Sequence, residues 1–398
     1  MGLPTALLLA NAGYKVYGFD INQQKISMLK NGILPFKEKG LKKLYQQSTK
    51  NFHPSNILKK SDVFLITVPT PLKKDKSCDL SSVKEASKTI TNVLDENNLI
   101  ILESTVPPRT TLDVVKPILD KTKKNYYLSY ASEKAMPGNT IYEMQYNHRI
   151  IGGINKESAE KTKQIYKKFV KAKIRITDTT TAETVKLMEN TYRDVNIALA
   201  NEFAQTLQKL KIDPWMAIQF ANYHPRVNIH KPGPGVGGHC LPIDPWFIID
   251  KDTKLIFQAR RINDSMPLKV LTFVETLLKD IKKPTITLFG VAYKENIDDT
   301  RESPTLPFIK EAIKKNIDVK IYDPHVKQFP IPLNSLNEST KNSDCIVLFT
   351  SHSSFFKINP EIISTNMRTR QILDTKNALD KSKWIKAGFK YYLMFNSL

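Results

Sequence analysis

Short β-branched runs that alternate with helix-length segments are the feature that most limits how this chain can fold. Before about residue 175 the runs are "YKVYGFD", "DVFLITVP", "LIILEST", "YYLSYASE" and "RIIGG", and after about residue 280 they are "PTITLFGVAY", "DVKIYDP", "DCIVLFT" and "RQILDT". Strands separated by helix-length segments indicate parallel βαβ units. The sequence therefore predicts an α/β fold with two doubly wound domains.

A single long helix is expected between these two regions. The stretch "TTTAETVKLMENTYRDVNIALANEFAQTLQKL" has apolar residues three and four apart, starts with threonines that can cap a helix, and holds no proline. Further helices are expected up to about residue 280. We therefore expect domains at residues 1–178, 179–280 and 281–398, with the long helix joining the two α/β domains.

The opening stretch, "MGLPTALLLANAGYKVYGFD", allows two opposed interpretations. "TALLLA" followed by "ANA" is similar to the core and cleavage triplet of an export signal, but no basic segment precedes it. The alternative is the second half of a dinucleotide-binding unit, with a helix after Gly2 and a strand that ends at Asp20, an acid placed to bind a ribose. We favour this alternative. It predicts that Gly2 is the last glycine of G-x-G-x-x-G, that the domains are Rossmann-like, and that the first strand of the N-terminal domain is missing.

Composition excludes several other classes of protein. No apolar run approaches the roughly 20 residues that cross a bilayer. The three cysteines are odd in number and widely spaced, which indicates neither a disulfide framework nor a metal site and favours the cytoplasm. The formal net charge is +21, but the lysines are spread along the whole chain. We therefore expect a basic surface with pockets for anionic substrates and no specific nucleic-acid partner.

The stretch "PGPGVGGHCLPIDPWF" satisfies G-x-G-x-x-G at Gly233, Gly235 and Gly238. It follows no predicted strand, and prolines follow it where a helix is required, so it is not a second dinucleotide motif. It is instead a glycine-rich loop that presents the thiol of Cys240, with Asp244 four residues later. A cysteine near cations can act as a nucleophile, although an isolated Cys-x-x-x-Asp is more often structural.

This loop resembles the nucleophile loop of the UDP-glucose/GDP-mannose dehydrogenase family, and other motifs similar to those of that family follow one another along nearly the whole chain. They are "GLPTALLLANAGYKVYGFD", "VPTP", "ESTVPP", "SEKAMPGNT", "KLMENTYRDVNIALANE" and "GVAYKENIDDTRESP". The resemblance implies a cytoplasmic, homodimeric enzyme that uses NAD and a UDP-sugar, with the long helix forming the dimer.

The implied reaction oxidises C6 of the sugar to a carboxylate with two NAD molecules in succession. "HPRVNI" before the loop and "DPWFI" within it are most similar to the members that act on UDP-N-acetyl-D-mannosamine and supply surface polysaccharides. UDP-N-acetylglucosamine and UDP-glucose remain alternative substrates. An alternative of another class is a nucleotide-sugar-binding protein without catalysis, which the incomplete dinucleotide motif suggests.

The resemblance also assigns catalytic roles. Cys240 attacks the C6 aldehyde, Asp244 orients water or moves protons, and Glu133 is the base for thioester hydrolysis. Lys186 and Asn190, four residues apart on one face of the long helix, steady an oxyanion at C6. Thr105 positions water.

Binding roles follow in the same way. The predicted cofactor-binding residues are Gly2, Asp20, Pro69, Thr70 and Thr105. The predicted substrate-binding residues are Lys186, Asn190, Arg226, Gly237, Lys294 and Arg301. For Arg301 an ion-paired turn with Asp298 and Asp299 is an equal alternative. Arg109 and Lys376 stand where the family usually has glycine and arginine, respectively.

Overall fold

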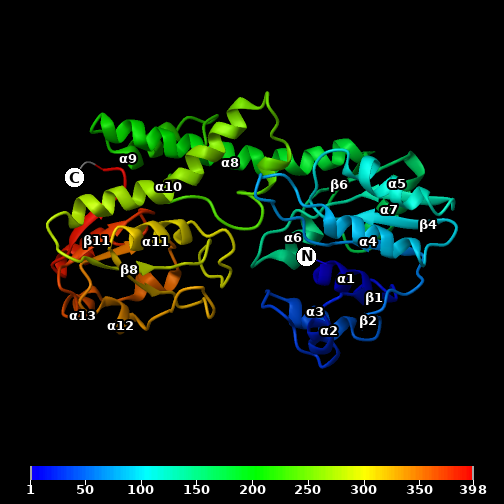
Figure 1. Ribbon diagram of the computed structural model, residues 1–398, viewed down its shortest axis with the longest axis horizontal. Helices are drawn as coiled ribbons and strands as arrows, with labels where there is room; N and C mark the ends of the chain where they lie inside the picture. The colour runs from blue at the N-terminus through cyan, green and yellow to red at the C-terminus, as the bar shows by residue number, and fades with distance from the viewer. Residues whose placement is uncertain (1, 397–398) are drawn as a thin grey trace. The chain divides into compact units, whose positions relative to one another are not determined.

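The computed structural model describes residues 2–396 and divides into two compact units (Figure 1). Unit 1 comprises Met1–Glu189 with Trp246–Ile248, and unit 2 comprises Asn190–Pro245 with Ile249–Leu398. Each unit contains one five-stranded sheet. This confirms the predicted α/β class.

The main sheet of unit 1 has the strand order β3-β4-β5-β6-β7. The strands are β3 (Val63–Ile66), β4 (Asn98–Leu102), β5 (Tyr126–Tyr130), β6 (Arg149–Gly153) and β7 (Ile174–Asp178). The helices before and between them are α1 (Gly2–Asn11), α2 (Gln23–Lys30), α3 (Leu41–Ser48), α4 (Ser81–Thr91), α5 (Lys116–Asp120), α6 (Thr140–Tyr146) and α7 (Lys156–Tyr166). Every residue of β4 is buried, as expected for an inner strand of an α/β sheet.

Two strands, β6 and β7, depart from the expected parallel arrangement. β6 pairs antiparallel with β5, whereas β3, β4 and β5 are parallel to one another and β6 is parallel to β7. The cause is the connection between β5 and β6, whose short helix α6 does not carry the chain back across the sheet. The connection therefore begins and ends at the same sheet edge.

The N-terminal strand β1 (Val16–Phe19) pairs in parallel with β2 (Phe52–Ser55) in a separate two-stranded sheet. Leu7 and Leu8 of α1 are buried in the core of this unit, as the βαβ interpretation of the opening stretch predicts. That a further strand belongs before Gly2 is not tested by these residues and stays a prediction.

The long helix is present. α8 runs without interruption over Thr179–Lys209, and Figure 1 shows it as one continuous helix. Two further helices follow, α9 (Pro214–Ala221) and α10 (Lys254–Leu278). Asp213 caps α9 through its carboxylate, and Pro214 occupies the first helical position, where its missing N–H costs nothing.

Unit 2 holds a fully parallel sheet in the order β12-β11-β10-β8-β9. Its strands are β8 (Thr285–Phe289), β9 (Asp318–Tyr322), β10 (Cys345–Leu348), β11 (Gln371–Asp374) and β12 (Lys390–Leu393). Its helices are α11 (Thr305–Lys314), α12 (Leu336–Thr340), α13 (Pro360–Ser364) and α14 (Lys381–Lys386). Four of the five strands match the predicted runs, and β12 was not predicted. Among residues 2–396, no helix combines the length and apolar composition that a membrane crossing requires.

Candidate active site

The predicted cofactor-binding threonines of unit 1 lie together at the carboxyl edge of the sheet. Thr70 follows β3 and Thr105 follows the neighbouring strand β4, and the Thr70 hydroxyl donates to the Thr105 carbonyl at 2.7 Å. The Ser104 hydroxyl donates to the Val68 carbonyl at 2.6 Å and ties the same two loops again. Ligands of α/β sheets bind at this edge, so the position suits a cofactor.

Gly2 and Asp20 also fit a dinucleotide. Gly2 is the first residue of α1, and a Cβ atom on it would lie 2.4 Å from the Thr67 hydroxyl, so only glycine allows this approach to the end of β3. Asp20 directly follows β1, is partly exposed, and accepts a hydrogen bond of 2.8 Å from the Asn22 amide. A helix N-terminus without side-chain bulk and an accessible acid after a strand are the features that bind a pyrophosphate and a ribose.

Lys186 and Glu133 are brought together within unit 1. The Lys186 ammonium donates to the Glu133 carbonyl oxygen at 2.8 Å, and the Lys186 side chain is buried. The Glu133 carboxylate accepts from the Ala135 amide at 2.5 Å, which fixes the turn that carries it. The helix α8 is therefore bound at Lys186 to the loop that follows β5.

Glu183, which was not predicted, anchors the start of α8. Its buried carboxylate accepts from the amides of Arg109 and Thr111 at 2.5 and 2.8 Å and from the Thr111 hydroxyl at 2.6 Å. Burial raises the pKa of Glu183 to about 7, although these hydrogen bonds act in the opposite direction. The glutamate one turn before Lys186 was visible in the sequence, but nothing there indicated burial.

The predicted residues of unit 2 form a second group. The side-chain amide of Asn190 donates to the Asp244 carboxylate at 2.6 Å, and both side chains are buried. The amides of Ile243 and Asp244 donate to the Cys240 carbonyl at 3.0 and 2.8 Å, which closes a turn around the thiol. The boundary between the units falls after Glu189, so this group and the Lys186 group belong to different units.

The loop that carries Cys240 packs against the loop between β8 and α11. A Cβ atom on Gly237 would lie 2.7 Å from the Tyr293 Cβ and 2.8 Å from the Glu302 carbonyl, and the Gly238 amide donates to the Arg301 carbonyl at 3.0 Å. Burial, and then the nearby charges of Asp299 and Cys240, raise the pKa of Tyr293 to about 12. Gly237 is therefore required by packing, in addition to its predicted contact with substrate.

The remaining predicted substrate residues differ in how they are held. Arg301 forms a bidentate ion pair with Asp299. The alternative role of Arg301 in an ion-paired turn is therefore present with Asp299. Lys294 is partly buried in the same loop. Arg226 is exposed after α9, and its amide hydrogen-bonds to the His224 ring. The structure does not bring Arg226 to the other predicted residues of unit 2.

Comparisons with known proteins show which proteins this chain is similar to. The NAD binding domain of the UDP-glucose/GDP-mannose dehydrogenase family matches residues 1–170, its central domain matches residues 180–266, and its UDP binding domain matches residues 287–381. The UDP-N-acetyl-D-mannosamine dehydrogenase of Methanococcus vannielii is 48% identical over 409 aligned residues, which cover 100% of this chain and 95% of that protein. The protein of the same name from Pyrococcus horikoshii is 41% identical and covers 95% of this chain and 94% of its own length.

Two solved structures are also similar along the whole chain. The UDP-D-ManNAc dehydrogenase of Pyrococcus horikoshii has a TM-score of 0.92 at 38% identity and covers 99% of this chain and 97% of that one. The UDP-N-acetyl-mannosamine dehydrogenase of Staphylococcus aureus has a TM-score of 0.90 at 39% identity and covers 100% and 96%. These matches confirm the Rossmann-like fold, the NAD dependence and the action on a UDP-sugar. This chain belongs to the UDP-glucose/GDP-mannose dehydrogenase family.

Proposed function

We propose that this enzyme oxidises C6 of UDP-N-acetyl-D-mannosamine to the carboxylate through a covalent adduct on Cys240. The names of the relatives at 41–48% identity support the substrate. The observation that carries the chemistry is the buried Asn190–Asp244 pair beside the turn that holds Cys240. UDP-N-acetylglucosamine and UDP-glucose are the alternative substrates.

In the first oxidation the C6 hydroxyl loses its proton and the C6 carbon loses a hydride, which gives an aldehyde. Gly2, Asp20, Pro69, Thr70 and Thr105 would hold NAD, which would supply a hydride acceptor for each of the two oxidations, one molecule for each. Lys186 and Asn190 stand one turn apart on α8, so their side chains leave the same face of the helix. A cation and an amide donor there stabilise negative charge on the C6 oxygen.

In the second oxidation the Cys240 sulfur adds to the aldehyde carbon, and the carbonyl oxygen takes up a proton. Loss of a hydride from C6 and of the hydroxyl proton then gives a thioester. The positive charge of Arg301 interacts with Cys240, and a nearby cation favours the thiolate that attacks. Water then breaks the carbon–sulfur bond, releasing the carboxylate and the thiol. We assign Asp244 and Glu133 to proton transfer in these steps and Thr105 to holding the water.

The UDP diphosphate carries two negative charges, which Lys294 and Arg301 in the loop after β8 can bind. Arg offers paired N–H groups, and Lys offers a compact charge. Asp299 already holds the Arg301 guanidinium in one orientation. That orientation lowers the entropy that the arginine loses when it binds an anion.

A homodimer is also proposed, with residues 179–280 as its dimerisation domain between domains 1–178 and 281–398. Exposed apolar side chains follow one face of α8 at spacings of seven and four residues, at Tyr192, Leu199 and Phe203, and the exposed Leu210 directly follows the helix. In α9, Met216 and Phe220 are also exposed. Apolar surface of this extent marks a protein interface. A cytoplasmic enzyme that supplies uronates to surface polysaccharides fits these features.

The test is NADH formation by the purified chain with each of the three nucleotide sugars, beside Cys240→Ala. We expect about two NADH per molecule of UDP-N-acetyl-D-mannosamine and no completed second oxidation in the variant. A clear preference for UDP-glucose would refute the substrate assignment. Calorimetry that showed UDP-sugar binding without NAD binding, together with no NADH, would instead identify a non-catalytic nucleotide-sugar-binding protein.

A further inference from the structure

In each unit an acid directly follows a strand of a parallel pair, but the two acids have different surroundings. Asp20 follows β1 in "YGFD", is partly exposed, and accepts one hydrogen bond from Asn22. Asp323 follows β9 in "KIYD" and is buried. An accessible acid at this position can bind a ribose, whereas a buried acid must be satisfied by the protein.

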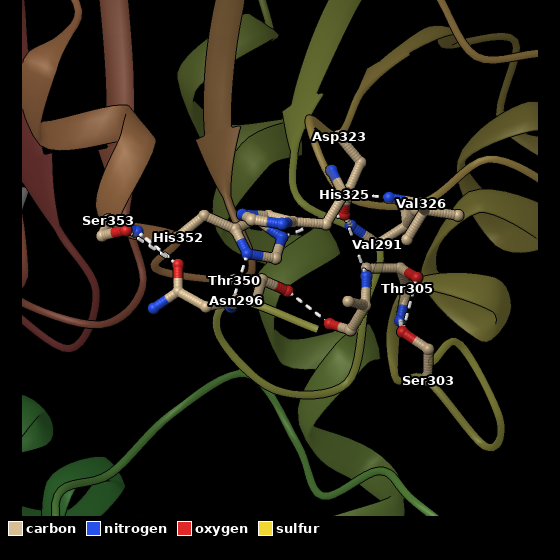
Figure 2. A network of polar contacts seen from close by, with 11 residues as sticks. Val291, Asn296, Ser303, Thr305, Asp323, His325, Val326, Thr350, His352 and Ser353 are labelled. Carbon is tan, nitrogen blue, oxygen red and sulfur yellow. Dashed lines mark hydrogen bonds and ion pairs between the residues drawn. The ribbon is translucent and has the colours of Figure 1, made fainter. Parts of the chain in front are cut away.

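The Asp323 carboxylate is satisfied by five donors, which Figure 2 shows in part. One oxygen accepts from the amides of Val291 and Ala292 at 2.8 and 3.1 Å and lies 3.0 Å from the His352 Nε2. The other oxygen accepts from the backbone amides of His325 and Val326, at 2.9 and 3.0 Å. Burial acts to raise the pKa of Asp323, but the His352 hydrogen bond and the amides outweigh it and lower the pKa to about 2. Asp323 therefore holds the start of the loop after β8.

His352 holds the same loop six residues after its start. Its Nδ1 accepts from the Asn296 amide at 2.9 Å, so the hydrogen sits on Nε2, which donates to Asp323. Asn296 has a positive φ of 60°, a conformation that asparagine adopts more readily than most residues. Its side-chain oxygen also accepts from the amide and hydroxyl of Ser353, both at 2.9 Å. Figure 2 shows these contacts meeting around the His352 ring.

The backbone held by these contacts is the segment that carries Lys294. Asp323 fixes it at Val291 and Ala292, and His352 fixes it at Asn296. The Thr350 hydroxyl adds a hydrogen bond of 2.5 Å to the Ala292 carbonyl. A flexible lysine can present its charge to a diphosphate reliably only when the backbone beneath it is fixed.

We propose that Asp323 and His352 are positioning residues that set the affinity of this enzyme for its UDP-sugar by fixing the segment 291–296. This rests on the proposed role of Lys294. In a dinucleotide-binding unit, the acid at the position of Asp323 would bind a ribose. Here Asp323 instead holds the segment 291–296, in part through the neutral ring of His352. Both side chains are buried and act through the segment, and the hydrogen bond between His352 and the Asn296 amide is the one on which affinity depends.

Two amide substitutions separate the two hydrogen bonds of His352. In His352→Asn the side-chain oxygen takes the place of Nδ1 and can still accept from Asn296. In His352→Gln the amide nitrogen takes the place of Nε2 and can still donate to Asp323, but the Asn296 amide loses its acceptor. Asp323 retains its four backbone donors in both variants.

We expect His352→Gln to raise KM for the UDP-sugar and weaken UDP binding about fivefold, the factor for one lost hydrogen bond, with kcat changed less than about twofold. His352→Asn should recover most of this affinity. Calorimetry with UDP and steady-state kinetics measure both, and thermal melting reports folding. Equal losses of affinity in the two variants, unchanged UDP affinity in His352→Gln, or a fall in kcat that follows a fall in melting temperature would each overturn the inference.

Lys294→Ala separates this inference from the proposed function. If Lys294→Ala binds UDP as the parent does, the proposed phosphate site is wrong and the inference is wrong with it. If Lys294→Ala loses UDP affinity while His352→Gln retains it, the phosphate site stands and only the positioning role is refuted.

Discussion

The Asn190 side-chain amide donates a hydrogen bond of 2.6 Å to the Asp244 carboxylate, and the Asp244 backbone amide donates to the Cys240 carbonyl. Asp244 therefore connects the long helix to the turn that carries the proposed nucleophile. We expect Asp244→Asn to retain both contacts, because its side-chain oxygen can accept from Asn190, while it loses the ability to take up a proton. Overall NADH formation should fall about 100-fold, as expected for loss of a general base. Normal turnover at neutral pH would exclude Asp244 from proton transfer.

Two glycines of the nucleophile loop should differ sharply in their tolerance of a methyl group. A Cβ on Gly237 meets the Tyr293 Cβ and the Glu302 carbonyl, which cannot move away easily, whereas a Cβ on Gly233 meets only the flexible end of Lys376, at 3.4 Å. Gly237→Ala should abolish most activity and lower the unfolding free energy by about 1–3 kcal/mol, and Gly233→Ala should change the unfolding free energy by less than about 1 kcal/mol. Activity assays and denaturant unfolding measure the two effects. Equal losses of activity and of unfolding free energy in Gly237→Ala and Gly233→Ala would contradict the packing between these loops.

Glu183 should make the stability of the protein depend on pH. Its folded-state pKa of about 7 lies above the ordinary value of 4.5, so the folded protein binds this proton more tightly than the unfolded protein. The free energy of unfolding should therefore fall by about 3 kcal/mol as the pH rises from about 4.5 to about 7, and then level off. Glu183→Gln should remove this decrease. Denaturant unfolding of both proteins across this pH range provides the comparison, and parallel curves would refute the assignment.

A buried ion pair in unit 1 should be sensitive to loss of either partner. Glu103 accepts from Arg149 at 3.0 Å and from Tyr166 at 2.5 Å, and all three side chains are buried. Arg149→Met leaves the buried Glu103 carboxylate without its cation and should lower the free energy of unfolding by about 3–5 kcal/mol. The matched control is Arg109→Met, which breaks an exposed pair with Asp113 and should cost less than about 1 kcal/mol. If urea unfolding gave similar losses of unfolding free energy for Arg149→Met and Arg109→Met, the predicted importance of the buried pair would be contradicted.

The proposed dimer predicts a change of mass on substitution in α8. Phe203 and Tyr192 are exposed on the apolar face of this helix. A glutamate at either position places a charge in the interface, so Phe203→Glu should sediment as a monomer at micromolar concentration where the parent sediments as a dimer. Leu255→Glu, at an exposed apolar position in α10, is the control. A parent that sediments as a monomer would disprove the interface.

The sequence predicted the parts of the fold that depend on local pattern. The proline-free periodicity of α8 and the β-branched runs of β8 to β11 marked these elements clearly. The short strand β12, "KYYL", was missed because two of its four residues are common in loops and helices as well, and only pairing with β11 selects the extended form. The antiparallel direction of β6 depends on how a connection crosses a sheet, which no local pattern records.

In the candidate site, too, some residues could be predicted from the sequence and others could not. Motifs identified Cys240, Asn190 and Asp244, which the structure places together. Glu183 and His352 were missed because their importance arises from burial and from partners 29 to 74 residues away in the sequence. Asp323 was identifiable, since "KIYD" repeats the pattern of "YGFD", but only the structure distinguishes a buried acid from an accessible one.

The antiparallel β6 has a consequence for how this architecture tolerates insertions. Because the connection from β5 to β6 begins and ends at one edge of the sheet, its length does not alter the register of either strand. Within this connection, Ala131 and Met144 are buried in the core, whereas residues 136–139 are exposed, so insertions are tolerated best at 136–139. The loop that is bound to Lys186 is thus a place in unit 1 where the length of the chain can vary without a change in strand pairing.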